Sequence, residues 1–152
     1  MQVERILRPS QVLTVWEFFL EGFETLRYLA RQHFDVVAMQ KYCCLLASDH
    51  TGGYLGIAFT DEGDPQAMLV AREVTLPYSK ERIFEVIALY NRRSQEDILL
   101  LLMGAFENWC RENGVVRYYF TTHRNTGATI RYYRHERFGF RKPALVFEKD
   151  IL

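Results

Sequence analysis

Glu85 is the residue whose surroundings best suit it to move a proton. It is the only acidic residue in an otherwise apolar run over residues 83–90. A carboxylate that is partly withdrawn from water is a better proton acceptor, so Glu85 could act as a general base. An outward-facing acid on a half-exposed strand has the same pattern, and the sequence leaves both interpretations open. Glu73 and His123 are weaker candidates for the same role.

The segment around Glu85 predicts a strand that leads into a long helix. Residues 83–90 are strand formers, residues 91–97 are a polar turn, and an apolar helical period follows until Gly114. The first backbone N–H groups of a helix lack intrahelical partners. The junction of strand and helix is therefore a natural site for an anion such as a phosphate.

Length and composition predict one globular domain over residues 1–152. The chain is 49% hydrophobic and 25% charged, which is ordinary for a soluble protein. No apolar run approaches the ~20 residues that a membrane span needs, and the N-terminus lacks the apolar core of a signal peptide. We expect a cytoplasmic protein with no membrane partner.

The cysteines and histidines indicate neither a disulfide framework nor a metal site. Cys43 and Cys44 are neighbours, Cys110 stands alone, and an odd number without framework spacing favours reduced thiols. Small apolar core residues are the simplest interpretation, and a reactive thiol is the alternative. The four histidines lack the spacing of metal ligands, so we expect no metal.

The formal net charge is zero but unevenly spread. Residues 51–110 hold five Lys and Arg against nine Asp and Glu, whereas residues 111–152 hold nine against four. A basic C-terminal quarter indicates either a solvated face or an anionic ligand. We do not expect nucleic acid as a partner, because chains that bind it are usually more basic overall.

The remaining elements follow from periodicity and turn residues. The N-terminal half predicts an edge strand over 1–7, an aromatic-rich amphipathic helix over 9–30 and a helix over 36–47 capped by Asp35. A hairpin over 54–60 and 66–76 continues into the strand around Glu85 as an antiparallel meander. A strand over 115–122 should run parallel to that strand, because a crossover helix joins them. A short helix around 128–137, broken at Gly139, and a last strand over 144–151 complete the chain.

The C-terminal tail carries a recognisable pattern. It has Asn-x-x-Ala from Asn125 to Ala128, an aromatic residue at Tyr132, and Gly139 with Phe140 before the last strand. Together with the order of elements, this tail resembles the GNAT N-acetyltransferase superfamily over about residues 54–151. The resemblance implies an α+β (mixed α/β) fold. Its central sheet would be mostly antiparallel with a splayed parallel pair of strands, flanked by about four helices.

The same resemblance implies transfer of an acetyl group from acetyl-CoA to an amine of a small molecule or protein, by direct attack in a ternary complex. In that family the pantetheine arm enters between the splayed strands, and a turn of pattern Q/R-x-x-G-x-G/A wraps the pyrophosphate. Gln95 falls at the first position of this turn, and Ile98 and Leu100 stand where the glycines would be. The resemblance assigns the cofactor to Leu89, Tyr90, Asn91, Arg92, Arg93, Gln95, Asp97, Ile98, Asn125 and Arg131.

A tyrosine of the penultimate helix protonates the departing CoA thiolate in the family, acting as a general acid. Counting from Asn125 gives Tyr132, whereas the local pattern I-R-x-Y gives Tyr133, which we favour. Two aromatic residues that pack a short helix on the sheet would have the same pattern. By the same family assignment, Glu85 becomes the base that deprotonates the amine.

A second hypothesis is a GNAT-like module without catalysis that has lost acetyl-CoA binding and serves binding or assembly. Its support is the filled glycine positions and the aromatic side chains of the first long helix. These are Trp16, Phe18, Phe19, Phe23 and Tyr28, which could bury themselves in a protein partner. Composition alone also suggests a homodimer. The acceptor cannot be read from the sequence, because this fold binds it with variable helices and loops.

Overall fold

The chain divides by its contacts into two units, Met1–Thr121 and Thr122–Leu152. The computed structural model describes residues 1–30, 34–93, 95–120, 137–141 and 151. All the helices and strands given below lie in the first unit. Gly139, at the predicted break in the second unit, has a φ of 68°, a left-handed conformation that favours glycine. The single domain, and the helix and strand expected after residue 121, stay predictions.

The described residues form a five-stranded mixed sheet in the order β1-β2-β3-β4-β5. Its strands are β1 (Gln2–Ile6), β2 (Gly53–Phe59), β3 (Pro65–Val74), β4 (Arg82–Asn91) and β5 (Val115–Phe120). Strands β1 to β4 pair antiparallel, and β5 runs parallel to β4. The predicted edge strand, meander and parallel strand are therefore confirmed.

Four helices accompany the sheet in the described part of the chain: α1 (Pro9–Thr14), α2 (Trp16–Ala30), α3 (Val36–Ser48) and α4 (Glu96–Glu112). The prediction of one helix from Pro9 onward was wrong, since the chain leaves helical geometry at Val15. Thr14 and Val15 are both β-branched, which weakens a helix interior. Asp35 caps α3 as predicted, and its carboxylate accepts from the Ala38 N–H at 3.0 Å.

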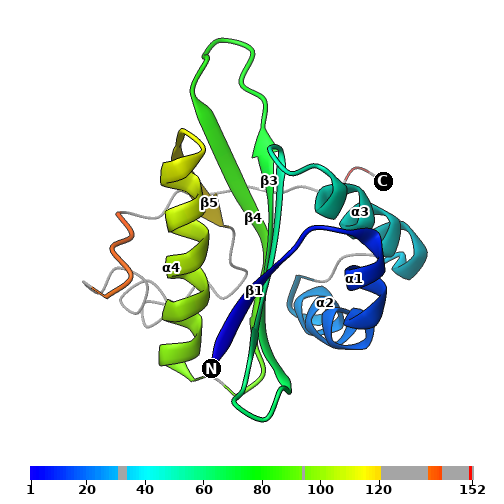
Figure 1. Cartoon of the computed structure of the whole chain (residues 1–152). Coiled ribbons are helices and arrows are strands. Elements are labelled where there is room, and N and C mark those ends of the chain that lie inside the picture. Colours follow the sequence, from blue (N-terminus) through cyan, green and yellow to red (C-terminus); the bar gives the residue numbers. More distant parts are fainter. Residues whose placement is uncertain (31–33, 94, 121–136, 142–150, 152) are drawn as a thin grey trace. The chain divides into compact units, whose positions relative to one another are not determined.

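The helices cover both faces of the sheet, with α4 on one face and α1, α2 and α3 on the other (Figure 1). The aromatic side chains Phe18, Phe19 and Phe23 of α2 are buried in the core between α2 and the sheet. Burial of this apolar area stabilises the fold. These three aromatic side chains thus pack inside the protein and are not open to a partner.

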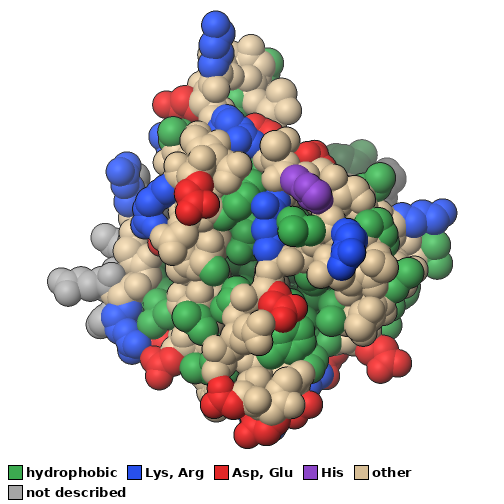
Figure 2. Space-filling model, viewed as in Figure 1, with side chains coloured by type: hydrophobic (Ala, Val, Ile, Leu, Met, Phe, Trp, Pro, Cys, Tyr) green, Lys and Arg blue, Asp and Glu red, His purple; other side chains and the backbone are tan. Residues whose placement is uncertain are grey.

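The surface drawn in Figure 2 carries basic and acidic side chains interspersed among apolar ones. That face does not offer the broad cationic surface on which nucleic acid binds. None of the described helices is both long and apolar enough to span a membrane.

Candidate active site at the end of the parallel strand pair

A β-bulge interrupts β4 at Ile87. Val70 of β3 pairs with Ala88 and Ala71 pairs with Val86, so Ile87 is an extra residue without a partner in this ladder. A bulge bends its strand and increases the local twist. Strand β4 therefore changes direction after Val86.

The bulge also changes which helices the strand contacts. Phe84 and Tyr90 are six residues apart and would share one face of a regular strand. Instead Phe84 packs on Phe106 and Trp109 of α4, whereas Tyr90 packs on Phe18 of α2, on the opposite face. One extra residue reverses the alternation of side chains. The end of β4 is thereby tied to α2.

The described pairing of β4 with β5 covers the first half of β4. The described ladder runs from Arg82 opposite Val115 to Val86 opposite Phe120, while β4 continues to Asn91. In the described part of the chain, residues 87–91 thus have no strand partner on the β5 side. The bulge at Ile87 follows Val86, the last β4 residue of the described ladder, and the splay of the two strands stays a prediction.

Glu85 lies two residues before the bulge, opposite Arg72 of β3 and Tyr119 of β5. The Arg72 Nε and Nη2 atoms both donate to Glu85 Oε2, at 3.2 and 3.0 Å. The Glu85 bond, with a contribution from Tyr42 of α3, raises the pKa of Arg72. The Glu85 side chain remains 22% exposed. Its carboxylate can therefore be reached from solvent while an arginine holds it in place.

Tyr119 completes this group on β5. Burial, and then the negative charge of Glu85, raises the pKa of its phenol. The phenol is therefore a neutral hydrogen-bonding group beside the carboxylate at ordinary pH.

The last residues of β4 bind neighbouring elements. The Asn91 amide donates to the Gln95 carbonyl at 2.7 Å, and its oxygen accepts from Gln66 Nε2 at 3.3 Å. Gln66 is itself buried, and its backbone carbonyl accepts from the backbone N–H of Arg92 at 2.9 Å. These bonds fix the start of the loop that leads to α4.

Arg92, which the resemblance assigns to the cofactor, is bound by Glu21 of α2 in this structure. Its Nε and Nη2 donate to the two carboxylate oxygens of Glu21 at 2.9 and 3.0 Å, and its guanidinium lies 4.8 Å from the Phe18 ring centre. The Tyr90 hydroxyl donates to the same carboxylate at 2.8 Å. The Arg92 bond is the main cause that lowers the pKa of Glu21.

The start of α4 places the other cofactor candidates. Gln95 is the N-cap residue, without a side-chain cap bond, and the first turn carries Glu96 and Asp97. Ile98, at the first of the two glycine positions, is 1% exposed, so its branched side chain points into the core. Leu100, at the second, is half-buried. Leu89 is half-buried and Arg93 is exposed in the loop.

The remaining predicted site residues lie outside the described residues: Tyr132, Tyr133, Asn125, Arg131 and His123. Their roles stay predictions. The structure adds Arg72, Tyr119 and Glu21, which the sequence reasoning missed. The register between the last two strands of the predicted meander would have revealed Arg72 opposite Glu85, but the bulge that determines the contacts of Tyr90 leaves no sequence signal.

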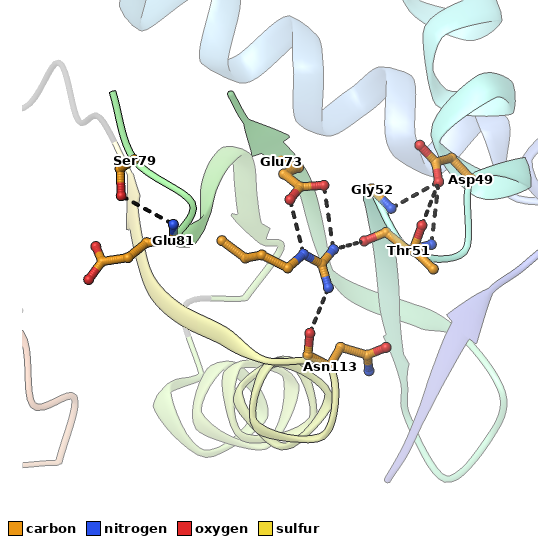
Figure 3. Close-up of polar contacts among 8 residues, drawn as sticks. Asp49, Thr51, Gly52, Glu73, Ser79, Glu81 and Asn113 are labelled. Carbon is orange, nitrogen blue, oxygen red and sulfur yellow. Dashed lines mark hydrogen bonds and ion pairs between the residues drawn. The ribbon is translucent and has the colours of Figure 1, made fainter. Parts of the chain in front are cut away.

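A second Arg–Glu pair, at the start of β4, is hydrogen-bonded to two further segments of the chain (Figure 3). Arg82 Nε donates to Glu73 Oε1 at 3.0 Å. Its Nη1 donates to the carbonyl of Asn113, which caps the C-terminus of α4, and its Nη2 donates to the carbonyl of Thr51. One guanidinium thus joins β3, the turn before β2 and the end of α4. These contacts make the pair a structural clamp.

The thiols take no part in this site. Cys43 and Cys110 are buried, and burial raises the pKa of each thiol to about 12. Neither is a reactive thiolate at neutral pH. No group of His, Cys, Asp and Glu in the described part of the chain is arranged to hold a metal.

Comparison by sequence finds no relative, since no protein-family model matches the chain and no curated protein matches it. The fold matches solved acetyltransferases. An aminoglycoside acetyltransferase from an uncultured soil metagenomic sample, in complex with sisomicin, has a TM-score of 0.70 at 13% identity, over 99% of this chain and 96% of that chain.

A ribosomal-protein-alanine N-acetyltransferase from Brucella melitensis biovar Abortus 2308 has a TM-score of 0.62 at 12% identity, over 100% of this chain and 99% of that chain. At these identities the likeness concerns the fold alone. The mixed sheet, its parallel pair and the flanking helices confirm the predicted architecture. The chain has the GNAT-like fold of acetyltransferases.

Proposed function

We propose that the protein is a cytoplasmic, acetyl-CoA-dependent N-acyltransferase that transfers an acetyl group to an amine in a ternary complex. The observation that carries this proposal is the bulge at Ile87, which bends β4 directly after Glu85 and Val86 in a chain with an acetyltransferase fold. An acyl carbonyl beside the freed edge of β4 would meet backbone N–H groups. Such donors stabilise the charge that develops on its oxygen.

Proton transfer falls to two kinds of side chain. Acetyl-CoA supplies the acyl group as a thioester. Glu85 accepts the proton that the amine loses as its nitrogen bonds to the acyl carbon. Tyr133, or Tyr132 in its place, donates a proton to the sulfur as the carbon–sulfur bond breaks. Arg72 holds Glu85 at the position from which it can reach the amine.

Several features of the β4–α4 junction fit the cofactor. The freed edge at Leu89, Tyr90 and Asn91 suits an extended chain, and exposed Arg93 offers a guanidinium to phosphate. The inward side chain of Ile98 leaves the first glycine position clear. The loop to Gln95 and the first turn of α4 with Asp97 would complete this binding surface, and the cofactor roles of Asn125 and Arg131 stay predictions. Arg92 would join only on release from Glu21.

The test is calorimetric titration of the full chain with acetyl-CoA and with CoA, together with thermal melting. Micromolar binding and a raised melting temperature are expected, because a ligand that binds the folded state stabilises it. Arg93→Gln should weaken this binding, while Arg111→Gln, a matched exposed arginine on α4, should not. Absence of binding at millimolar ligand would contradict the proposal.

The alternative is a GNAT-like binding module without cofactor. The observation that favours it is the pair of carboxylates in the first turn of α4, Glu96 and Asp97, which would repel a pyrophosphate. The burial of Phe18, Phe19 and Phe23 of α2 argues against this module, because the hypothesis used these side chains as its docking surface. Absence of binding in the titration would favour this module, and Glu96→Gln with Asp97→Asn should then restore binding, because the repulsion is removed.

A further inference from the structure

We infer that the acceptor is a small amine that also carries a carboxylate, an amino-acid-like zwitterion. It is recognised on the sheet face that Glu85 shares with Arg72 and Arg117. The transfer step rests on the proposed function, whereas the class of ligand follows from the charges of this face.

Strand register brings these side chains together. Arg72, Glu85 and Tyr119 are direct neighbours across β3, β4 and β5. Arg117 precedes Tyr119 by two residues on β5 and pairs with Ile83. Cross-strand neighbours project from the same face of a sheet, as do residues two apart.

That face is the one away from α4. Tyr118, between Arg117 and Tyr119, donates its hydroxyl to Glu107 of α4 at 2.7 Å, and its ring packs on Phe106 of the same helix. Because side chains alternate along a strand, Arg117 and Tyr119 project from the opposite face. Glu85 also alternates with Phe84, which packs on α4. The contact of Tyr42 of α3 with Arg72 is consistent with this assignment.

The carboxylate has capacity for an ammonium group. Both bonds from Arg72 go to Glu85 Oε2, so Oε1 can accept from a ligand. The side chains are 22% exposed at Glu85 and 48% exposed at Arg72, and both can therefore be reached. An amine bound to Oε1 would lie beside the strand edge at Val86 and Ile87, where the proposed transfer occurs.

The charges around this carboxylate favour an acceptor with an anionic group. Arg117 is exposed and forms no ion pair with any described residue. Together the three described side chains Arg72, Arg117 and Glu85 carry one excess positive charge. Guanidinium binds carboxylate in a planar, two-bond geometry. A polycationic acceptor would be repelled, while a zwitterion satisfies Glu85 with its amine and the arginines with its carboxylate.

The experiment compares matched ligands that differ only in this anion. The free amino acids glycine, leucine and lysine, and their carboxamides, are titrated calorimetrically into the full chain, and their acetylation by acetyl-CoA is followed by mass spectrometry. For the wild-type chain we expect each acid to bind about tenfold more tightly than its amide. Arg117→Gln should reduce that preference about threefold to fivefold.

The variants separate recognition from structure. Arg117→Gln removes no described ion pair, so its melting temperature should match that of the wild type. Arg72→Gln should reduce the preference further, and Arg72→Lys should partly restore it. Arg111→Gln, on α4, should leave the preference intact. A preference unchanged in Arg117→Gln and Arg72→Gln would overturn the inference.

The two proposals fail in different ways. Equal binding and equal acetylation of acids and amides would overturn the inferred acceptor class, while the proposed acyltransferase function would still be supported. If the chain prefers acids but binds no acetyl-CoA, the proposed acyltransferase function is contradicted and the inferred ligand class is still supported. No binding of any acid or amide at millimolar concentration would overturn the acceptor class.

Discussion

Two Arg–Glu pairs join the same two strands and have opposite surroundings. Arg72 and Glu73 are adjacent on β3, so they project from opposite faces of the sheet. Arg72 pairs with Glu85 on the face away from α4, and Glu73 pairs with Arg82 on the α4 face. Arg82 also binds two backbone carbonyls, whereas both bonds of Arg72 go to one oxygen of Glu85 and leave the other available. Identical chemistry thus serves structure at one pair, whereas at the other we propose that it serves ligand binding.

The largest expected effect is on the pair at the end of the parallel ladder. Glu85→Gln should lower kcat for acetyl transfer about 100-fold or more, because general base catalysis is worth that much. Its free energy of unfolding should change by less than about 1 kcal/mol, since an exposed ion pair contributes little. Steady-state kinetics and urea unfolding measure both. Full activity would remove Glu85 from the mechanism.

Tyr133→Phe tests the proposed general acid, which belongs to the second unit of the chain. We expect kcat to fall about 100-fold because the departing thiolate loses its proton donor. Tyr132→Phe is the matched variant, and activity should stay within a few-fold of wild type. If Tyr132→Phe alone lowers kcat, the two assignments exchange; if neither does, the general acid lies elsewhere.

Arg82→Gln tests the structural role of the Arg82–Glu73 pair. It leaves Glu73 and two carbonyls without their donor, and the free energy of unfolding should fall by about 2 kcal/mol. Transfer activity per folded molecule should remain at the wild-type level. Arg72→Gln is its control and should cost less than about 1 kcal/mol. Equal stability losses in the two variants would break the distinction between the pairs.

A third pair, Glu21 with Arg92, gives the smallest effect. The folded-state pKa of Glu21 is lowered, chiefly by its bond to Arg92, so its contribution to stability is present above the unfolded pKa and is lost as pH falls through the folded value. Both side chains are more than a third exposed, and we expect less than about 1 kcal/mol. Glu21→Gln should melt lower than wild type at pH 7, and the difference should shrink as the pH falls through the folded-state pKa of Glu21. Glu24→Gln, on the same helix, is the control.

The sequence predicted the architecture because its signals were local. Alternating and helical periods located the strands and helices, and Asp35 located the start of α3. The break at Val15 was missed because the apolar period continues across it. Boundaries elsewhere moved by one or two residues, as capping and fraying allow.

The site was predictable only in part, since it depends on register. Glu85 was identified from its apolar context, but its partner Arg72 lies on another strand. The bulge at Ile87 redirects Tyr90 toward α2 without any change in composition. The bond between Arg92 and Glu21 joins residues 71 positions apart, which no local pattern reports. Tyr132 and Tyr133 lie outside the described residues and stay predictions.

Hydrogen–deuterium exchange of the full chain, with and without acetyl-CoA, tests most directly the claim that the freed end of β4 is where the cofactor binds. Amides of residues 87–95 should exchange more slowly when acetyl-CoA is present, because the ligand covers this strand edge and loop. Amides around Thr51 and Asn113, beside the structural clamp of Arg82, should exchange at the same rate in both samples. Unchanged exchange over residues 87–95, or protection only around Thr51 and Asn113, would contradict the account.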